Sequence, residues 1–317
     1  MKRIALLLSP LAKNAYFKDY LEIAKIELLD LLGDEQLIEH RMIAAMDFFE
    51  LEAAEKHLPA LARLSSVLGV FEQSGEQLTP LAVDNGLQLH EDFVFAAKFK
   101  GKTNETLTQL LINVGLQRLD YSSLKSVKLL DPMCGRATTL LWAMRYGINA
   151  KGIEQDPRAL VDIRQNIKKL CKLHRVKHQL KEGFIGKSNK HDKGKFIDFS
   201  TADNAMRVIA GDSAEASNML KAEKFHLIVS DLPYSAQHFS ADKAHKPLAV
   251  LEGLVSDWCK CLKPEGVMVL AFNRFIPRRD QLIAVIEAAG MQALDFSAPH
   301  RMSESVVRDV VVFKKAL

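Results

Sequence analysis

Apolar positions along the chain follow two alternating spacings, and the alternation predicts an α/β protein. Residues 138–146 and 157–174 carry apolar side chains at helical spacing, whereas the shorter apolar runs between such segments have the length of buried strands. These runs lie at residues 127–130, 149–154, 209–211 and 225–230. Strands that alternate with helices predict a mostly parallel sheet with helices on its faces.

The C-terminal part continues the pattern and would complete a seven-stranded sheet. A helix is predicted at residues 248–262 with Trp258 in the core, a strand at 267–272, and a helix at 281–289 that Gly290 ends. The last two strands are expected at residues 291–296 and 306–313. We assign residues 91–317 to this larger domain.

The first 90 residues predict a separate, small α/β domain. Its expected elements are a strand at 3–8, a helix at 17–31 ended by Gly33, a strand at 42–49, a helix at 53–64 and a strand at 67–71. This order is typical of an α/β sandwich such as a ferredoxin-like unit. The polar stretch Gln73 to Gln77, which contains Gly75, is expected to close it.

Composition limits the class of protein. A chain of 317 residues is long enough for two domains with a substantial core. Its four cysteines show neither metal-ligand pairs nor a secreted disulfide framework, so we expect a cytoplasmic protein. The apolar run at residues 4–8 follows Lys2 and Arg3 but is short for a signal peptide, and no segment approaches the roughly 18 apolar residues of a membrane span. The histidines lack metal-ligand spacing, and we expect no metal.

Four consecutive predicted strands end in an acid. The acids are Asp131, Glu154, Asp212 and Asp231. Because the carboxyl ends of parallel strands open onto one crevice, these acids are expected along a ligand site. Glu154, roughly twenty residues after the first strand, is placed to accept hydrogen bonds from ribose hydroxyls.

The turn after the first strand has the composition of a ligand-binding loop. Asp131 to Leu140 forms a strand-turn-helix junction, where a small-residue turn lets a ligand approach the backbone and the helix start offers N–H groups. Its centre reads Gly135-Arg136-Ala137. Since Ala does not take a positive φ without strain, we expect cofactor binding only with residue 137 in an ordinary conformation.

Two motifs resemble a known family. Asp131-Pro132-Met133-Cys134-Gly135 is similar to the glycine-rich turn of class I S-adenosylmethionine-dependent methyltransferases, and Asp231-Leu232-Pro233-Tyr234 is similar to the (Asp/Asn)-Pro-Pro-(Tyr/Phe) tetrad of their amino-methylating branch. Lys102 to Glu105, before a predicted helix, also fits, with Thr103 as its expected N-cap. Over about residues 95 to 315 the chain most resembles the THUMP-associated RNA guanine methyltransferases. A Rossmann-like domain with S-adenosylmethionine as cofactor is implied.

The resemblance assigns roles to particular residues. The residues expected at the cofactor are Thr103, Asp131, Met133, Gly135, Thr138, Glu154, Gln155, Asp212, Ser213 and Asp231. Catalysis is assigned to Asp231, Leu232, Pro233 and Tyr234. The Asp231 carboxylate and the Leu232 carbonyl would accept the N–H bonds of a base amine and orient its lone pair, while Tyr234 would stack on the base. Leu232 replaces the commoner Pro, and Ser235 stands where the RNA enzymes often have Gly.

The basic character of the chain is local. Residues 168–195 contain ten Lys or Arg and two acids, a net charge of +8, whereas the whole chain carries +4. This segment predicts contact with a polyanion, or else a solvated loop. We expect nucleic-acid contacts from Lys187, Lys190, Lys193, Lys195, Arg274 and Arg301.

These observations predict an enzyme that methylates an exocyclic amine of a nucleic-acid base, first of all the guanine 2-amino group in tRNA or rRNA. Adenine in DNA and a glutamine amide in protein are alternatives, because similar tetrads serve those reactions. A cofactor-binding, RNA-associated protein without catalysis is a further alternative, indicated by Ala137 and Leu232. The N-terminal domain would be accessory or RNA-binding, although it is too short for a THUMP module with its customary ferredoxin-like neighbour.

Overall fold

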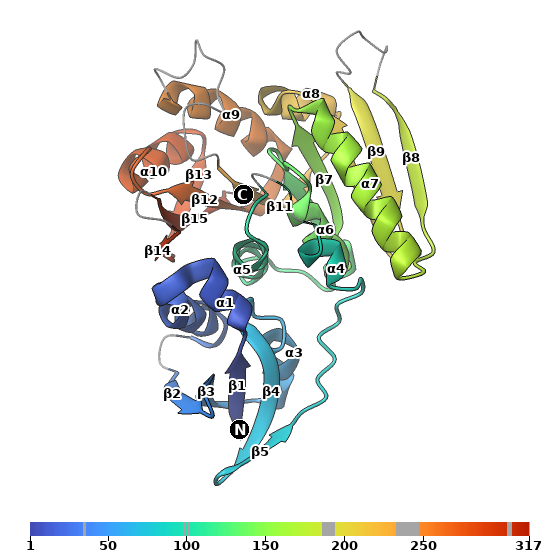
Figure 1. The fold of residues 1–317 in the computed structure, drawn as a ribbon. Coiled ribbons are helices and arrows are strands. Elements are labelled where there is room, and N and C mark those ends of the chain that lie inside the picture. The colour runs from blue at the N-terminus through green and yellow to red at the C-terminus, as the bar shows by residue number, and fades with distance from the viewer. Residues whose placement is uncertain are drawn as a thin grey trace.

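The chain folds around two β-sheets (Figure 1). The structure, a computed structural model, describes residues 1–33, 36–97, 99, 102–185, 194–232, 247–302 and 306–316. Within these ranges no helix combines the length and the apolar character that a bilayer crossing requires.

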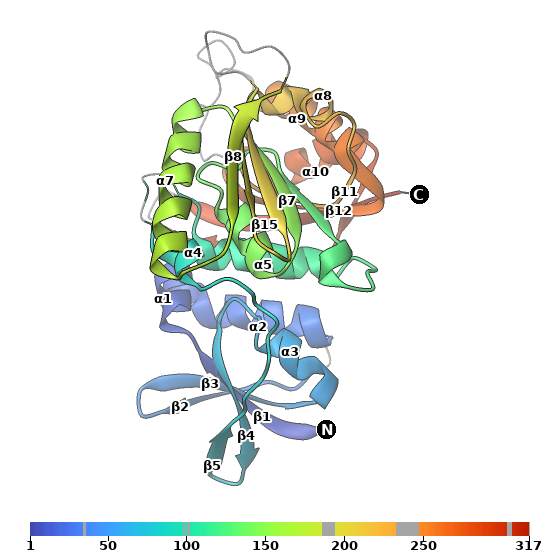
Figure 2. The same ribbon diagram turned by 90° about the vertical axis from the view of Figure 1, so that its right-hand side faces the viewer.

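The first sheet is antiparallel throughout. Its strands are β1 (Lys2–Leu8), β2 (Glu39–Ile43), β3 (Met46–Ala53), β4 (Val67–Ser74) and β5 (Gln77–Pro80), in the order β2-β3-β1-β4-β5. Helices α1 (Pro10–Tyr16) and α2 (Tyr20–Leu32) follow β1, and α3 (Leu58–Leu61) precedes β4. The succession β-α-β-β-α-β is that of the ferredoxin-like unit, and β5 adds an edge strand. Figure 2 shows α1 and α2 between this sheet and the larger domain.

Three expectations for this unit were wrong in detail. The apolar run at residues 42–49 is not one strand, because Ala44 and Ala45 take φ values of 48° and 64° and turn the chain between β2 and β3. The helix expected over 53–64 is shorter, since β3 continues to Ala53. Gly75, with φ of 59°, forms the turn between β4 and β5, so the first sheet continues to Pro80.

The second sheet is mixed and mostly parallel in its centre, as predicted. Its strands are β6 (Lys128–Asp131), β7 (Asn149–Glu154), β8 (Gln179–Phe184), β9 (Lys195–Ser200), β10 (Ala205–Ala210), β11 (Phe225–Asp231), β12 (Leu262–Asn273), β13 (Met291–Leu294), β14 (His300–Arg301) and β15 (Val307–Lys315). The order is β13-β15-β12-β11-β6-β7-β10-β9-β8, with β14 beside β15. Seven strands correspond to those expected, and β8, β9 and β14 extend them. The strand order reverses between β6 and β11, where open α/β sheets form their ligand crevice.

Helices cover both faces of this sheet. They are α4 (Asp92–Phe95), α5 (Glu105–Leu116), α6 (Thr138–Arg145), α7 (Pro157–Leu173), α8 (Ala216–Met219), α9 (Pro247–Cys261) and α10 (Arg279–Ala288). Neighbouring residues of β6 point to opposite faces: Leu129 packs in the core that contains Trp142 of α6, and Leu130 in the core that contains Trp258 of α9. The alternation of side chains along a strand produces these two layers.

A buried polar network joins the two units at α5. The Glu27 carboxylate of α2 accepts hydrogen bonds from the Ser65 N–H and hydroxyl and from the Asn113 amide at 2.7 Å. Arg118 donates to both oxygens of Asp30 at 2.6 and 2.8 Å. The N-terminal unit is therefore held against α5 by satisfied polar contacts as well as by apolar packing.

Candidate active site

The parallel strands bring the predicted acids to one edge of the second sheet. Asp131, Glu154 and Asp231 are the last residues of β6, β7 and β11, and Asp212 follows β10 by two residues. Since β11, β6, β7 and β10 are successive neighbours, the four acids form one row. The structure shows that they differ in what they contact.

Asp131 is directed into the protein. Its residue is 3% exposed, and the carboxylate accepts hydrogen bonds from the Met133 N–H at 3.1 Å and the Ser230 hydroxyl at 2.9 Å. Burial raises the pKa of the Asp131 carboxyl from 3.8 to about 6, against the opposing effect of these hydrogen bonds. Asp131 therefore ties the loop after β6 to β11, and its place at the cofactor stays a prediction.

Glu154 shapes the loop and keeps acceptor capacity. One carboxylate oxygen accepts from the Gly135 N–H and the other from the Asp156 N–H, both at 2.8 Å. Each carboxylate oxygen has a second lone pair. The half-buried Glu154 can thus hold the glycine turn and accept a ligand hydroxyl, and the exposed Gln155 follows it at the rim.

The turn at Gly135 has room for a ligand. Gly135 takes φ of +52°. Apart from Gly135 and its two chain neighbours, no described residue has a heavy atom within 4 Å of the position that a Cβ would occupy there. The turn can approach β7 because Gly152 lacks a side chain: a Cβ at Gly152 would lie 2.7 Å from the Cys134 sulfur. The Arg136 guanidinium then fixes the turn to α7 by bonding Asp162 at 3.0 Å.

Ala137 does not take the ordinary conformation that the sequence led us to require. Its φ of 65° and ψ of 29° lie in the left-handed region, immediately before α6. This geometry costs a non-glycine residue about 1–2 kcal/mol. The condition that the sequence set for cofactor binding is therefore not met. The turn nevertheless keeps the path that glycine would give it, at the cost of backbone strain at Ala137.

Of the other residues expected at the cofactor, Met133 and Thr138 belong to this turn and to the start of α6, whereas Asp212 and Ser213 follow β10. Thr138 opens α6 and is 3% exposed, and Met133 packs against the second core. Asp212 is exposed and its carboxylate accepts from the Ala214 N–H at 3.0 Å, while the Ser213 carbonyl accepts from Trp258.

The loop before α5 differs from expectation in its cap. The N-cap is Asn104, whose side chain accepts from the Leu107 N–H at 3.0 Å, and not Thr103, which is half-buried beside it. The Lys102 ammonium binds the Val94 and Ala97 carbonyls and Glu105, so it anchors this loop internally.

Of the proposed catalytic tetrad, the structure describes Asp231 and Leu232. Asp231 ends β11, and the Leu232 N–H donates to the Ala271 carbonyl of β12 at 2.9 Å. The Leu232 side chain is buried in the second core, so its carbonyl is the group that can serve chemistry. Pro233 and Tyr234 lie outside the described residues.

A buried arginine that the sequence analysis did not assign contacts this tetrad. Arg308 of β15 is 0% exposed; its Nη1 donates to the Leu232 carbonyl at 3.2 Å, and its Nη2 forms an ion pair with Asp231. Burial lowers the pKa of the Arg308 guanidinium to about 9. The available signal was the pair Arg308-Asp309 inside an otherwise apolar predicted strand.

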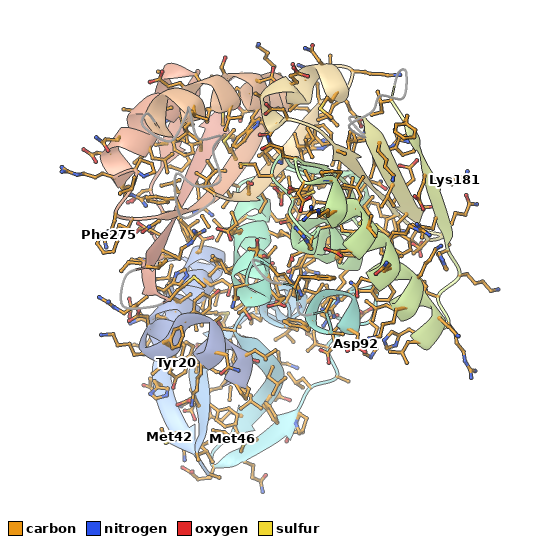
Figure 3. The ribbon with its side chains drawn as sticks, turned by 45° about the horizontal axis from the view of Figure 1, so that its top comes forward. Tyr20, Met42, Met46, Asp92, Lys181 and Phe275 are labelled. Atoms are coloured by element: carbon orange, nitrogen blue, oxygen red, sulfur yellow. The ribbon has the colours of Figure 1, made fainter. Side chains whose placement is uncertain are left out.

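The predicted nucleic-acid contacts fall on two sides of the crevice. Arg274 follows β12 and Arg301 lies in β14; both are exposed and flank the start of β15. Lys195 begins β9, five strands from β12 and hence roughly 24 Å away. Phe275, 56% exposed, points outward beside Arg274 (Figure 3). Lys187, Lys190 and Lys193 lie outside the described residues.

Asp92 joins two histidines away from the crevice. It lies at the start of α4 beside α7 (Figure 3), and its carboxylate is 2.8 Å from His174 Nε2 and 3.5 Å from His90 Nδ1. The two imidazole rings are stacked with centroids 4.0 Å apart and planes inclined by 19°. The ligand atoms of the three side chains lie within 4.8 Å of one another, but the His90 Nδ1 lone pair already accepts a hydrogen bond from the Asp92 N–H at 3.2 Å. The cluster therefore links α4 to α7 as a structural contact.

A hollow of about 420 Å³ lies at the opposite edge of the sheet, among the first residues of β6, β7, β10 and β11. Its cations are largely neutralised: Lys128 and Lys151 pair with Glu223, and Arg207 pairs with Asp198. The row of acids lies at the other end of these strands, so the hollow does not belong to the proposed site.

Comparisons with known proteins give structural similarity alone. No family model and no curated protein matches the sequence. Among solved structures, TrmN from Thermus thermophilus aligns with a TM-score of 0.44 and 15% identity over 88% of this chain, which spans 60% of the TrmN chain. Magnesium protoporphyrin IX methyltransferase from Synechocystis PCC 6803 aligns with a TM-score of 0.45 and 9% identity. The alignment covers 71% of this chain and 89% of the methyltransferase chain. N-methyltransferase NodS from Bradyrhizobium japonicum WM9 aligns with a TM-score of 0.42 and 14% identity. The alignment covers 67% of this chain and 95% of the NodS chain.

Proposed function

We propose that this protein is an S-adenosylmethionine-dependent methyltransferase that modifies an exocyclic amine of a nucleic-acid base, with the guanine 2-amino group of tRNA or rRNA as the first candidate. The observation that carries the proposal is the row of strand-end acids beside the open turn at Gly135, with the acceptor pair of Asp231 and the Leu232 carbonyl two strands from Glu154.

The residues at the turn fit the cofactor. The space above Gly135 accepts a ligand against the backbone, and Glu154 keeps lone pairs for ribose hydroxyls. The start of α6 at Thr138 would face the carboxylate of the amino acid part. Asp212 and Ser213, at the end of the next strand, would border the adenine. When bound, S-adenosylmethionine supplies an electrophilic methyl group.

The protein's own part in catalysis is orientation of the target amine. An amine conjugated to a ring is a weak nucleophile, because its lone pair is delocalised. If its two N–H groups donate to Asp231 and to the Leu232 carbonyl, the lone pair is directed toward the methyl carbon. Such positioning supplies on the order of several kcal/mol of the barrier. Asp231 would also accept the proton that the methylated nitrogen releases.

RNA as substrate is supported by charge and exposed aromatic surface. Arg274 and Arg301 on one side of the crevice and Lys195 on the other would contact phosphates, and Phe275 offers a face for base stacking. The N-terminal unit supports this rim, because Asp19 accepts a hydrogen bond from the Arg301 N–H at 2.9 Å. We assign it an accessory or RNA-binding role.

Two measurements test the proposal. Calorimetric titration of S-adenosylmethionine should give a dissociation constant in the micromolar range. Glu154→Ala should abolish this binding, whereas Gln155→Ala, at the exposed rim, should retain more of it. Transfer of labelled methyl groups should then be measured to bulk RNA, DNA and protein. Transfer to DNA or protein alone would replace RNA by the corresponding substrate. Cofactor binding without transfer to any of the three would favour a non-catalytic, RNA-associated protein.

A further inference from the structure

Arg308 is a fully buried cation at the end of the crevice where the target amine would lie. Its position on β15 is opposite Asn273 of β12 and His300 of β14. Nη1 contacts the Leu232 carbonyl and Nη2 contacts one oxygen of Asp231. One planar guanidinium therefore touches both acceptors of the proposed amine site.

Counted over the described part of the chain, this contact leaves the acceptors with further capacity. A carboxylate has two oxygens with about four acceptor sites, and a carbonyl has two lone pairs. Arg308 uses one oxygen of Asp231 and one lone pair of Leu232. Although burial lowers its pKa to about 9, the guanidinium remains charged at pH 7. The Asp231–Arg308 pair is thus formally neutral.

We propose that Arg308 is a positioning residue that holds the Asp231 carboxylate and the Leu232 carbonyl together and balances the carboxylate charge, so that the pair receives a neutral amino group and not an ammonium ion. This inference rests on the proposed function and narrows its substrate class. A nucleobase amine or an amide is neutral at pH 7. The ammonium group of a lysine side chain would find no uncompensated charge at Asp231 to hold it.

The shape of the guanidinium makes the inference specific to arginine. Its planar fork carries separate N–H donors toward two acceptors, whereas a lysine ammonium is a single point charge on a flexible stem. Arg308→Lys keeps the charge but loses the simultaneous contact. Arg308→Met removes both the charge and the contact and keeps an unbranched apolar side chain.

Steady-state kinetics of these two variants test the inference. Concentrations are normalised to sites that bind S-adenosylmethionine, so that misfolded protein does not count. We expect kcat to fall about tenfold in Arg308→Lys and at least a hundredfold in Arg308→Met, while KM for cofactor and for RNA stays within about threefold. An unchanged kcat per binding site in Arg308→Met would mean a merely structural role and overturn the inference. Transfer to poly-lysine by the unsubstituted protein would overturn the neutral-amine specificity.

A double-mutant cycle on urea unfolding tests the contact without any substrate. The variants are Arg308→Met, Asp231→Asn and both together. Each single variant leaves one charge without its counter-charge, the Arg308 side chain being fully buried and the Asp231 side chain 10% exposed. We therefore expect the unfolding constant of the double variant to differ at least tenfold from the product of the two single effects. If the unfolding constant of the double variant equals the product of the two single effects, the role of Arg308 is overturned, whatever methyl transfer the variants show. A coupled pair in a protein that methylates no amine would overturn the proposed function and not the contact.

Discussion

Glu27 and Asp231 are both carboxylates held by groups from distant parts of the chain, but their partners differ in charge. Glu27, between the two units, is 2% exposed and accepts hydrogen bonds from the neutral donors Ser65 and Asn113. Burial raises its pKa, although these hydrogen bonds oppose the rise. Asp231, at the crevice, faces the cation of Arg308.

This difference separates an acid that joins the two units from the acid that we propose as part of the substrate site. Both oxygens of Glu27 already receive donors from the protein, from the Ser65 N–H and hydroxyl and from the Asn113 amide. Asp231 has its charge balanced by Arg308, and that contact occupies one oxygen. A charge-balanced acceptor at a sheet edge can exchange hydrogen bonds with a neutral ligand at low electrostatic cost.

The largest expected effect is the loss of methyl transfer when Asp231 is replaced. Asp231→Ala should reduce methyl transfer about 10³-fold, equivalent to roughly 4 kcal/mol in the barrier, because the target amine loses an acceptor. Single-turnover transfer with saturating cofactor measures it. Glu27→Gln, which alters the interface acid, should leave turnover per cofactor-binding site within about twofold. An equal loss in both variants would contradict the separation of roles.

The role of Glu27 at the domain interface is tested by the free energy of unfolding. Asn113→Leu should lower the free energy of unfolding by about 3 kcal/mol, because Glu27 and the Tyr146 hydroxyl, at 2.7 and 2.6 Å from the Asn113 side chain, both lose a partner. Urea unfolding measures the change. Gln117→Leu, at an exposed position after the same helix, serves as control. A loss no larger than the control's would show that the network does not hold the units together.

A third acid, Asp131, forms no ion pair with any described residue and lies away from the domain interface. Its pKa of about 6 makes the contribution of this carboxyl to stability depend on pH. The folded protein retains this proton between about pH 4 and 6 and the unfolded chain does not. The stabilisation is therefore complete below pH 4 and is lost as pH rises through 6. Asp131→Asn should remove this dependence, on the order of 2 kcal/mol between pH 4.5 and 7.

Urea midpoints across that range, compared with those of the exposed-acid variant Asp212→Asn, measure the effect of Asp131. A pH dependence that is the same in the unsubstituted protein and in Asp131→Asn would show that this carboxyl stays ionised in the fold.

The smallest expected effect concerns the basic segment. Replacing Lys190, Lys193 and Lys195 with Gln should lower RNA affinity about tenfold at 0.1 M salt and reduce the slope of log K against log salt by about two. Filter binding across a salt series measures both. Exposed lysines near the opposite edge of the sheet provide the control set: Lys125, Lys221 and Lys224. Equal slopes for the two sets would leave the segment a solvated insertion.

The sequence by itself determined the features that depend on local pattern. The strand at 149–154 and the helix from Pro157 were predicted with nearly their observed bounds, because alternation and helical spacing are properties of neighbouring residues. The alignment of strand-end acids followed as well, since parallel strands end at one edge. The sequence did not predict turns inside apolar runs, such as the turn at Ala44 and Ala45. Alanine is not a residue type that indicates a positive φ.

Only the tertiary structure decided how the acids are used. Arg308 lies 76 residues after Leu232, and the insertion of β15 beside β12 brings them together. Asn113 reaches Glu27 across 86 residues in the same way. The left-handed Ala137 is held by the packing of its turn against β7. A sequence pattern records which side chains face the core, whereas the pairing of buried polar groups depends on which strands and helices become neighbours.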